Sequence, residues 1–188
     1  MSAEGTYTRL PPDIEREIGG LVVQWAYIES LASTTLYDVL KIGPKQGRLC
    51  FSKQSPERCL DSIVALAKLH KRTIEINVKT LRKNLESFGS WRNAIVHGVW
   101  TPKKGVRGPV LLLTRSEVPE AKTKPKSLLL TARGLKQFNE KISRIVEMME
   151  EFHHKALKQP SDEGDVGETK ASTVELLEPM PLRLIQTP

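Results

Sequence analysis

Three residues near the middle of the chain combine side chains that bind phosphate and transfer protons. Residues 91 to 98 read Trp-Arg-Asn-Ala-Ile-Val-His-Gly. The planar guanidinium of Arg92 suits a phosphate, and the imidazole of His97 can accept or donate a proton near neutral pH. Asn93 and His97 are four residues apart, so in a helix they share a face and the amide can hydrogen-bond the imidazole. These three residues form the candidate catalytic group.

Arg92 occupies an unusual place in its predicted helix. At about 100° per residue it falls in the middle of an apolar stripe, where a core helix normally carries leucine. The stripe consists of Ile74, Val78, Leu81, Leu85, Phe88 and Ile95. Glu29 is a matching exception, because it falls on the apolar stripe of an earlier predicted helix. An ion pair between Glu29 and Arg92, across two packed helices, is the simplest way to compensate both charges.

The same residues have a purely structural interpretation. Arg92 would be paired with a buried Glu29, and His97 would bond to the backbone where its helix passes into the turn at Gly98. Because one ion pair satisfies an arginine completely, a strong Glu29 pairing argues against the use of Arg92 on phosphate. The sequence leaves both interpretations open.

Other catalytic and metal-binding patterns are absent from the sequence. There is no glycine-rich phosphate loop, nucleophile elbow or His-Glu-x-x-His zinc motif. His153 and His154 are neighbours about 100° apart on a helix, so they are poor joint metal ligands. Cys50 and Cys59 lack metal-ligand spacing and fit a reducing cytoplasm. We therefore expect no metal or other cofactor, a cytoplasmic location and, without an apolar run of roughly 18 residues, no membrane span.

At Arg92, Asn93 and His97 the chain resembles the HEPN superfamily, the "higher eukaryotes and prokaryotes nucleotide-binding" helical domains. That family's motif is an arginine, a polar residue that is often asparagine, three further residues and a histidine. The resemblance covers the helical layout of about residues 12 to 157. It implies a bundle of about four helices that forms a homodimer, with the two motifs facing each other across the interface.

Many HEPN proteins are metal-independent endoribonucleases, and the residue types here fit that chemistry. Cleavage through the 2′-hydroxyl of RNA needs a proton acceptor, a proton donor for the leaving 5′-oxygen and a cation for the phosphorane. The resemblance implies that His97 transfers protons, Arg92 holds the phosphate, and Asn93 orients His97 or donates to the phosphate. A two-fold dimer would bring two histidines into one cleft and supply both proton transfers.

Charge is distributed unevenly along the 188 residues. The formal net charge is +7, but residues 159 to 188 hold two basic against six acidic residues, which leaves +11 on residues 1 to 158. Such a basic body favours a polyanionic partner such as RNA, because neutralised phosphates release counterions. The most basic segment, residues 98 to 133, contains the predicted RNA-binding residues Lys103, Lys104, Arg107 and Arg115. Edge-strand lysines that deter aggregation explain the same pattern equally well.

Apolar periodicity predicts four helices, over about residues 14–40, 55–70, 72–96 and 131–157. Residues 43–55 are predicted to form a loop, and short apolar runs between turn residues predict a β-hairpin or three-stranded flap at about 98–131. Gly19 and Gly20 inside the first helix predict a bend or a closely packed backbone. The predicted fold is therefore mainly α, a HEPN-like bundle over residues 1–158 with an inserted β-hairpin.

Residues 159–188 are predicted to be a flexible acidic tail, because the stretch from Ser161 to Ser172 is polar and poor in helix formers. The stretch from Val174 to Ile185 is more apolar, and the protein's own basic body is one surface on which it could dock.

Two functions from different classes follow from the sequence. One is a metal-independent endoribonuclease of HEPN type, in stress or phage defence as the resemblance implies. The other is a non-catalytic RNA-binding or protein-interaction module in which the arginine and histidine are structural.

Overall fold

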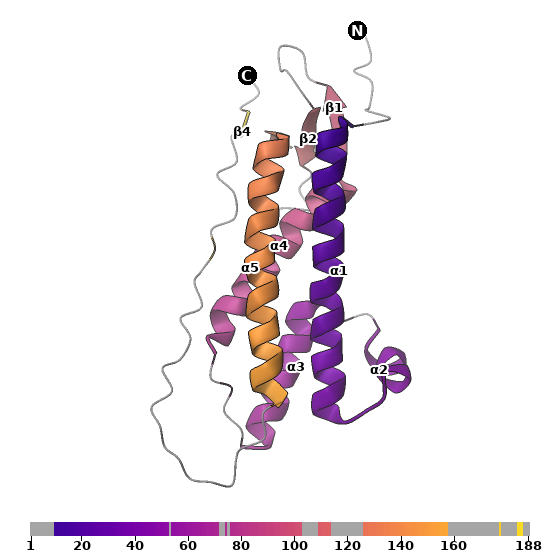
Figure 1. The fold of residues 1–188 in the computed structure, drawn as a ribbon, viewed down its shortest axis with the longest axis vertical. Coiled ribbons are helices and arrows are strands. Elements are labelled where there is room, and N and C mark those ends of the chain that lie inside the picture. Colours follow the sequence, from indigo (N-terminus) through magenta and orange to yellow (C-terminus); the bar gives the residue numbers. More distant parts are fainter. Residues whose placement is uncertain are drawn as a thin grey trace. The chain divides into compact units, whose positions relative to one another are not determined.

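A computed structural model of the chain describes residues 10–52, 54–71, 74, 76–102, 109–113, 126–157, 177 and 184–185. Helices predominate among these residues, which confirms the mainly α prediction (Figure 1). The helices are α1 (Pro12–Leu40), α2 (Pro44–Phe51), α3 (Pro56–Leu69), α4 (Val78–His97) and α5 (Ala132–Leu157). The strands are β1 (Val99–Pro102), β2 (Pro109–Leu113), β3 (Lys126–Leu129) and β4 (Leu184–Ile185).

The chain divides into two compact units. The first contains Met1–Gln24, Ser87–Ile142 and Glu178–Pro188, and the second contains Trp25–Glu86 and Ser143–Leu177. Helices α1, α4 and α5 each contribute residues to both units.

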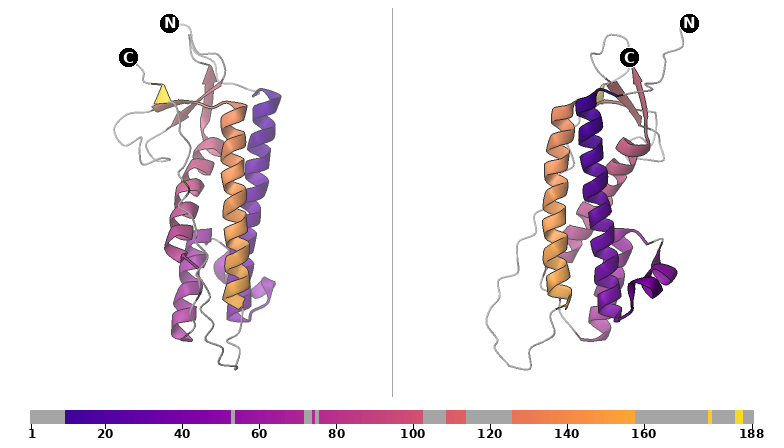
Figure 2. Two further views of the ribbon diagram at one scale, coloured as in Figure 1. Left: turned by 60° about the vertical axis from the view of Figure 1, so that its left-hand side comes forward. Right: turned by 45° about the vertical axis from the view of Figure 1, so that its right-hand side comes forward.

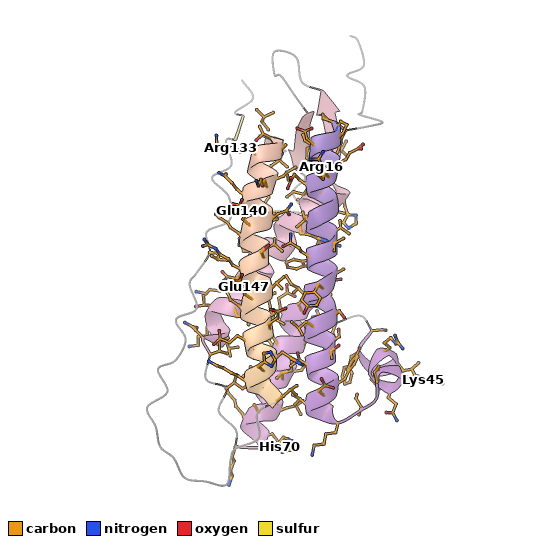
Figure 3. The ribbon with its side chains drawn as sticks, viewed as in Figure 1. Arg16, Lys45, His70, Arg133, Glu140 and Glu147 are labelled. Atoms are coloured by element: carbon orange, nitrogen blue, oxygen red, sulfur yellow. The ribbon has the colours of Figure 1, made fainter. Side chains whose placement is uncertain are left out.

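In the first unit, the beginning of α5 packs beside the beginning of α1. Phe88 of α4 stacks on Phe138 of α5, with ring centroids 5.1 Å apart, and both rings are buried. Asn139 Nδ2 donates to the backbone oxygen and to Oε2 of Glu17, each at 2.9 Å. Arg133 on α5 is exposed and points away from α1 (Figure 3). The aromatic stack is therefore the centre of this unit's core.

An antiparallel sheet with strand order β1-β2-β3-β4 completes the first unit (Figure 2). Its strands β1 to β3 fall in the segment for which the sequence predicts short strands. One cross-strand row places Trp100 opposite Leu111, Leu111 opposite Leu128, and Leu128 opposite Leu184. This row defines the register of all four strands.

In the second unit, residues predicted to be a loop contain a helix. Helix α2 begins at Pro44, and the backbone N–H of Gly43 donates to Gln46 Oε1 at 3.0 Å. A Cβ added at Gly47 would lie 2.5 Å from the ring of Tyr37 on α1, so only glycine lets α2 approach this closely. Lys45 on the other side of α2 points away from α1 (Figure 3). The loop prediction was wrong because contact with α1, and not apolar periodicity, holds this short helix in place.

Helix α4 begins later than the sequence predicts. The predicted start is near residue 72, whereas the first helical residue is Val78. Lys71, which follows α3, has a φ of 54°, and this left-handed conformation is incompatible with continuing a helix. Asn77 Oδ1 accepts from the backbone N–H of Thr80 at 3.1 Å and so caps α4. The helix continues past Gly89 to His97.

Among the described residues, no backbone packs closely against the two glycines of α1. A Cβ added at Gly19 would meet no atom within 4 Å, and one at Gly20 would meet only the side chain of Asn139, at 3.4 Å. The predicted close backbone approach is therefore wrong.

Most of the predicted acidic tail, including Ser161 to Ser172, lies outside the described residues. Leu177 is buried in the second unit, and β4 pairs with β3 in the first. No helix in the described ranges is long and apolar enough to cross a membrane.

Candidate functional site

The candidate catalytic residues lie in the last two turns of α4, where buried neighbours fix Arg92. Phe88, one turn earlier, and Ile95, three residues later, are both fully buried. Arg92 lies between them along α4, and its side chain is half-buried. Its backbone position is thus set by the core of the first unit.

The guanidinium of Arg92 is only partly satisfied. Its Nη1 donates to Asn93 Oδ1 at 2.9 Å, whereas its Nε is shielded from solvent and lacks a hydrogen-bond partner among the described residues. An arginine carries five N–H donors. Leaving a buried donor without a hydrogen bond costs about 1–3 kcal/mol. Because Nε is shielded, the donors of Arg92 that an oxyanion could use are the other guanidinium N–H groups, of which only one is committed to Asn93.

His97 is the last residue of α4, and its imidazole is exposed. The ring makes no hydrogen bond or ion pair with any other described residue, so the backbone bond of the structural interpretation is not seen there. The turn that follows is well fixed. Trp100 Nε1 donates to the carbonyl of Ile95 at 3.2 Å, and the N–H of Gly98 donates to the carbonyl of Ala94 at 2.9 Å. The accessible imidazole of His97 thus lies at a helix end that two hydrogen bonds hold in place.

Asn93 contacts a different partner from the one predicted. Its side chain is exposed, and Oδ1 accepts from Arg92. No hydrogen bond joins Asn93 to His97, although the two residues share a face of α4. The charged guanidinium is the stronger donor, so it takes the amide oxygen that the sequence assigned to the imidazole.

Glu29 is not the buried carboxylate that the sequence predicts, because its side chain is exposed. An exposed carboxylate gains little from pairing with a cation. The buried ion pair required by the structural interpretation of Arg92 therefore loses its basis.

The predicted RNA-binding residues Lys103, Lys104, Arg107 and Arg115 lie outside the described residues. The strands on either side of them are described, and β1 begins two residues after His97. The RNA-binding assignment of this basic segment stays a prediction.

Described residues of the second unit form two pockets. Arg92, Asn93 and His97 line neither of them. One, of about 370 Å³, is mostly aliphatic and includes Leu66 and Ile74, with Lys41 and His70 among its lining. The other, of about 400 Å³, lies where α2 meets α1 and is rich in hydroxyl groups; Glu29 is part of its lining. In the described part of the chain, no group of three or more His, Cys, Asp or Glu side chains is arranged to hold a metal ion.

Sequence reasoning missed two polar contacts in the second unit. Thr35 is fully buried, and its hydroxyl donates to the carbonyl of Leu31 at 2.7 Å and lies 2.9 Å from His153 Nδ1. Because that hydroxyl has one hydrogen, His153 is the donor in the second bond. The other missed contact involves Asn84, a buried polar residue among the apolar positions of α4. A lone asparagine on an apolar stripe is the sequence signal that could have revealed it.

Comparison with known proteins gives no relative for this chain. No family model matches it, and neither does any curated protein or any solved structure.

Proposed function

We propose that the chain is a metal-independent endoribonuclease of HEPN type that cleaves RNA by attack of its own 2′-hydroxyl. The observation that carries this proposal is the arrangement at the end of α4, where half-buried Arg92, whose donors are only partly satisfied by described residues, lies five residues before His97, whose exposed imidazole makes no hydrogen bond or ion pair with another described residue. A purely structural arginine at a half-buried position would normally have its buried donors satisfied within the fold. Here Arg92 and His97 both retain their capacity for a ligand.

Each residue has a defined role in this reaction. His97 removes the proton of the 2′-hydroxyl or protonates the leaving 5′-oxygen, since an imidazole can do either near neutral pH. Arg92 binds the non-bridging oxygens of the phosphate and stabilises the charge of the phosphorane. Asn93 holds the guanidinium through its Oδ1. One imidazole performs one proton transfer at a time, so we propose a homodimer in which a second His97 supplies the other.

The proposal extends to RNA as substrate, to the basic segment as its contact surface and to a role in stress or phage defence. The net charge of +11 over residues 1–158 supports a polyanionic substrate. No step requires a metal ion, because the guanidinium supplies the positive charge.

The test compares three full-length proteins, the wild type, His97→Ala and His154→Ala, on a mixed RNA pool in excess chelator. His154 is also an exposed histidine on a helix, which makes its replacement a matched control. We expect His97→Ala to lower cleavage by at least about 100-fold and His154→Ala to change it little. The products should carry 2′,3′-cyclic phosphates. Equal cleavage by all three proteins contradicts the assignment.

One observation favours the alternative function. No described residue orients the imidazole of His97, whereas general bases are commonly positioned by a second group. If the wild type binds RNA or an acidic protein but leaves RNA intact, the motif belongs to a non-catalytic interaction module.

A further inference from the structure

The buried side chain of Asn84 binds the backbone of the C-terminal segment. Asn84 lies on α4 in the second unit and is 1% exposed. Its Oδ1 accepts a hydrogen bond from the backbone N–H of Leu177 at 3.2 Å, and its Nδ2 lies 3.7 Å from Met148 Sδ on α5. Leu177 itself is 5% exposed. A buried side-chain oxygen thus accepts a hydrogen bond from a residue 93 positions away in the sequence.

A leucine would fit this position on α4 without any polar atom to satisfy. Leu81 and Leu85, on either side of Asn84, are both fully buried. Burying an amide is costly unless it is hydrogen-bonded, and burying a backbone N–H carries the same requirement. The bond between Asn84 and Leu177 meets both requirements at once. Recognition of this backbone group is one role that an asparagine can fill here and a leucine cannot.

The stretch of chain between α5 and Leu177 is long enough for Leu177 to reach Asn84 of the same molecule. Met148 lies nine residues before Leu157, the end of α5, which corresponds to about 14 Å along the helix. The connecting residues, 158 to 176, can span up to about 60 Å when extended. The entropic cost of closing a connection rises only slowly with its length, and a tethered segment has an effective concentration near the millimolar range.

We infer that Asn84 and Met148 anchor a docking site for leucine-bearing peptide segments, and that this chain's own Leu177 occupies it as a tethered, releasable ligand. The amide of Asn84 recognises the peptide backbone, and burial of the leucine side chain gives selectivity. The segment reads Glu-Leu-Leu-Glu over residues 175 to 178, so it is acidic where the body of the protein is basic. A separate peptide of this kind can bind only when the tethered copy leaves.

The first experiment measures binding of a fluorescein-labelled peptide of residues 172–180 to full-length chains by fluorescence polarisation. Leu177→Ala weakens the tethered competitor, so the peptide should bind this chain about tenfold more tightly than the wild type. Leu176→Ala removes the same apolar volume from the neighbouring position and is the matched control, with affinity close to that of the wild type. Equal affinity for all three chains, or equal effects of the two substitutions, overturns the inference.

Two further measurements separate the docking site from the segment that fills it. Adding Asn84→Leu to the Leu177→Ala chain removes the acceptor and should abolish the gain in peptide affinity. Because that variant can fail to fold, hydrogen exchange at the Leu177 amide of the unmodified chain provides a second readout. We expect slow exchange that is independent of protein concentration. Fast exchange overturns the inference, and protection that grows with protein concentration would assign the docked segment to a second copy.

Discussion

Arg92 and Asn93, consecutive residues of α4, are joined side chain to side chain by a hydrogen bond of 2.9 Å. Neighbours in a helix point about 100° apart, so this bond draws the guanidinium from the buried side of α4 toward the exposed amide. The contact therefore fixes the direction in which the positive charge of Arg92 is presented.

Under the proposed endoribonuclease function, Arg92→Lys should abolish most cleavage while leaving the fold intact. Lysine keeps the charge but loses the planar arrangement of donors that matches two phosphate oxygens. We expect cleavage to fall by about 100-fold, the typical effect of removing a donor to the developing negative charge. Asn93→Ala should have a smaller effect, because it frees the guanidinium without removing it. Single-turnover rates check the order, and unchanged thermal melting of both variants checks the fold; a full-rate Arg92→Lys enzyme would remove Arg92 from the site.

Mixing wild type with His97→Ala tests the shared cleft. If both histidines of a dimer act on one phosphate, only dimers with two wild-type chains cleave RNA. With nine parts of variant to one of wild type, about one dimer in a hundred is then active, against about one in five if each motif works alone. The expected result is activity that falls with the square of the wild-type fraction after the subunits have exchanged. A linear fall contradicts the shared cleft but not the role of His97.

Gly47→Ala and Gly19→Ala should change stability in opposite directions. A Cβ at position 47 would lie 2.5 Å from the ring of Tyr37, so we expect a loss of about 1–3 kcal/mol of unfolding free energy. Position 19 is also helical and has no atom within 4 Å of an added Cβ, so alanine should stabilise α1 by about 0.5–1 kcal/mol. Urea denaturation of both variants checks the signs. Equal effects would show that α2 does not depend on its contact with Tyr37.

The two free cysteines should react with iodoacetamide at very different rates. Cys50 is exposed, whereas Cys59 is buried, and this burial raises the pKa of the Cys59 thiol. A raised pKa lowers the fraction of thiolate, which is the reactive form. The shift also predicts that unfolding becomes easier as the pH rises above the ordinary thiol pKa, because only the unfolded chain then ionises readily. Mass spectrometry of peptides after timed labelling checks the order, and equal rates at pH 8 would contradict it.

The sequence predicts the long helices well because each carries a sustained apolar period. The start of α5 is the clearest case, since the predicted helix begins at residue 131 and Thr131 Oγ1 accepts from the N–H of Gly134 at 3.1 Å. Helix α2 could not be predicted in this way, because its eight residues hold few apolar positions and depend on Tyr37. Local pattern carries no information about such a distant contact.

The motif was located by its spacing, but its contacts were not. Asn93 and His97 share a helix face, but this does not decide from which group the amide oxygen of Asn93 accepts a hydrogen bond. It accepts from the charged neighbour Arg92. Glu29 lies at the margin of its apolar stripe, where a long side chain can turn into water. The pairing of Asn84 with Leu177 joins residues 93 positions apart, beyond the reach of any local rule.

That separation also orders events during synthesis. A ribosome adds about 5–20 residues per second, so Leu177 follows Met148, the later residue of the docking site, by roughly 1.5–6 s. Helix α5 is already complete by then, because it ends at Leu157. Each nascent chain therefore passes through an interval in which the surface around Asn84 and Met148 exists without its own ligand. During that interval, a chaperone or another nascent chain can bind at the site that Leu177 occupies in the finished molecule.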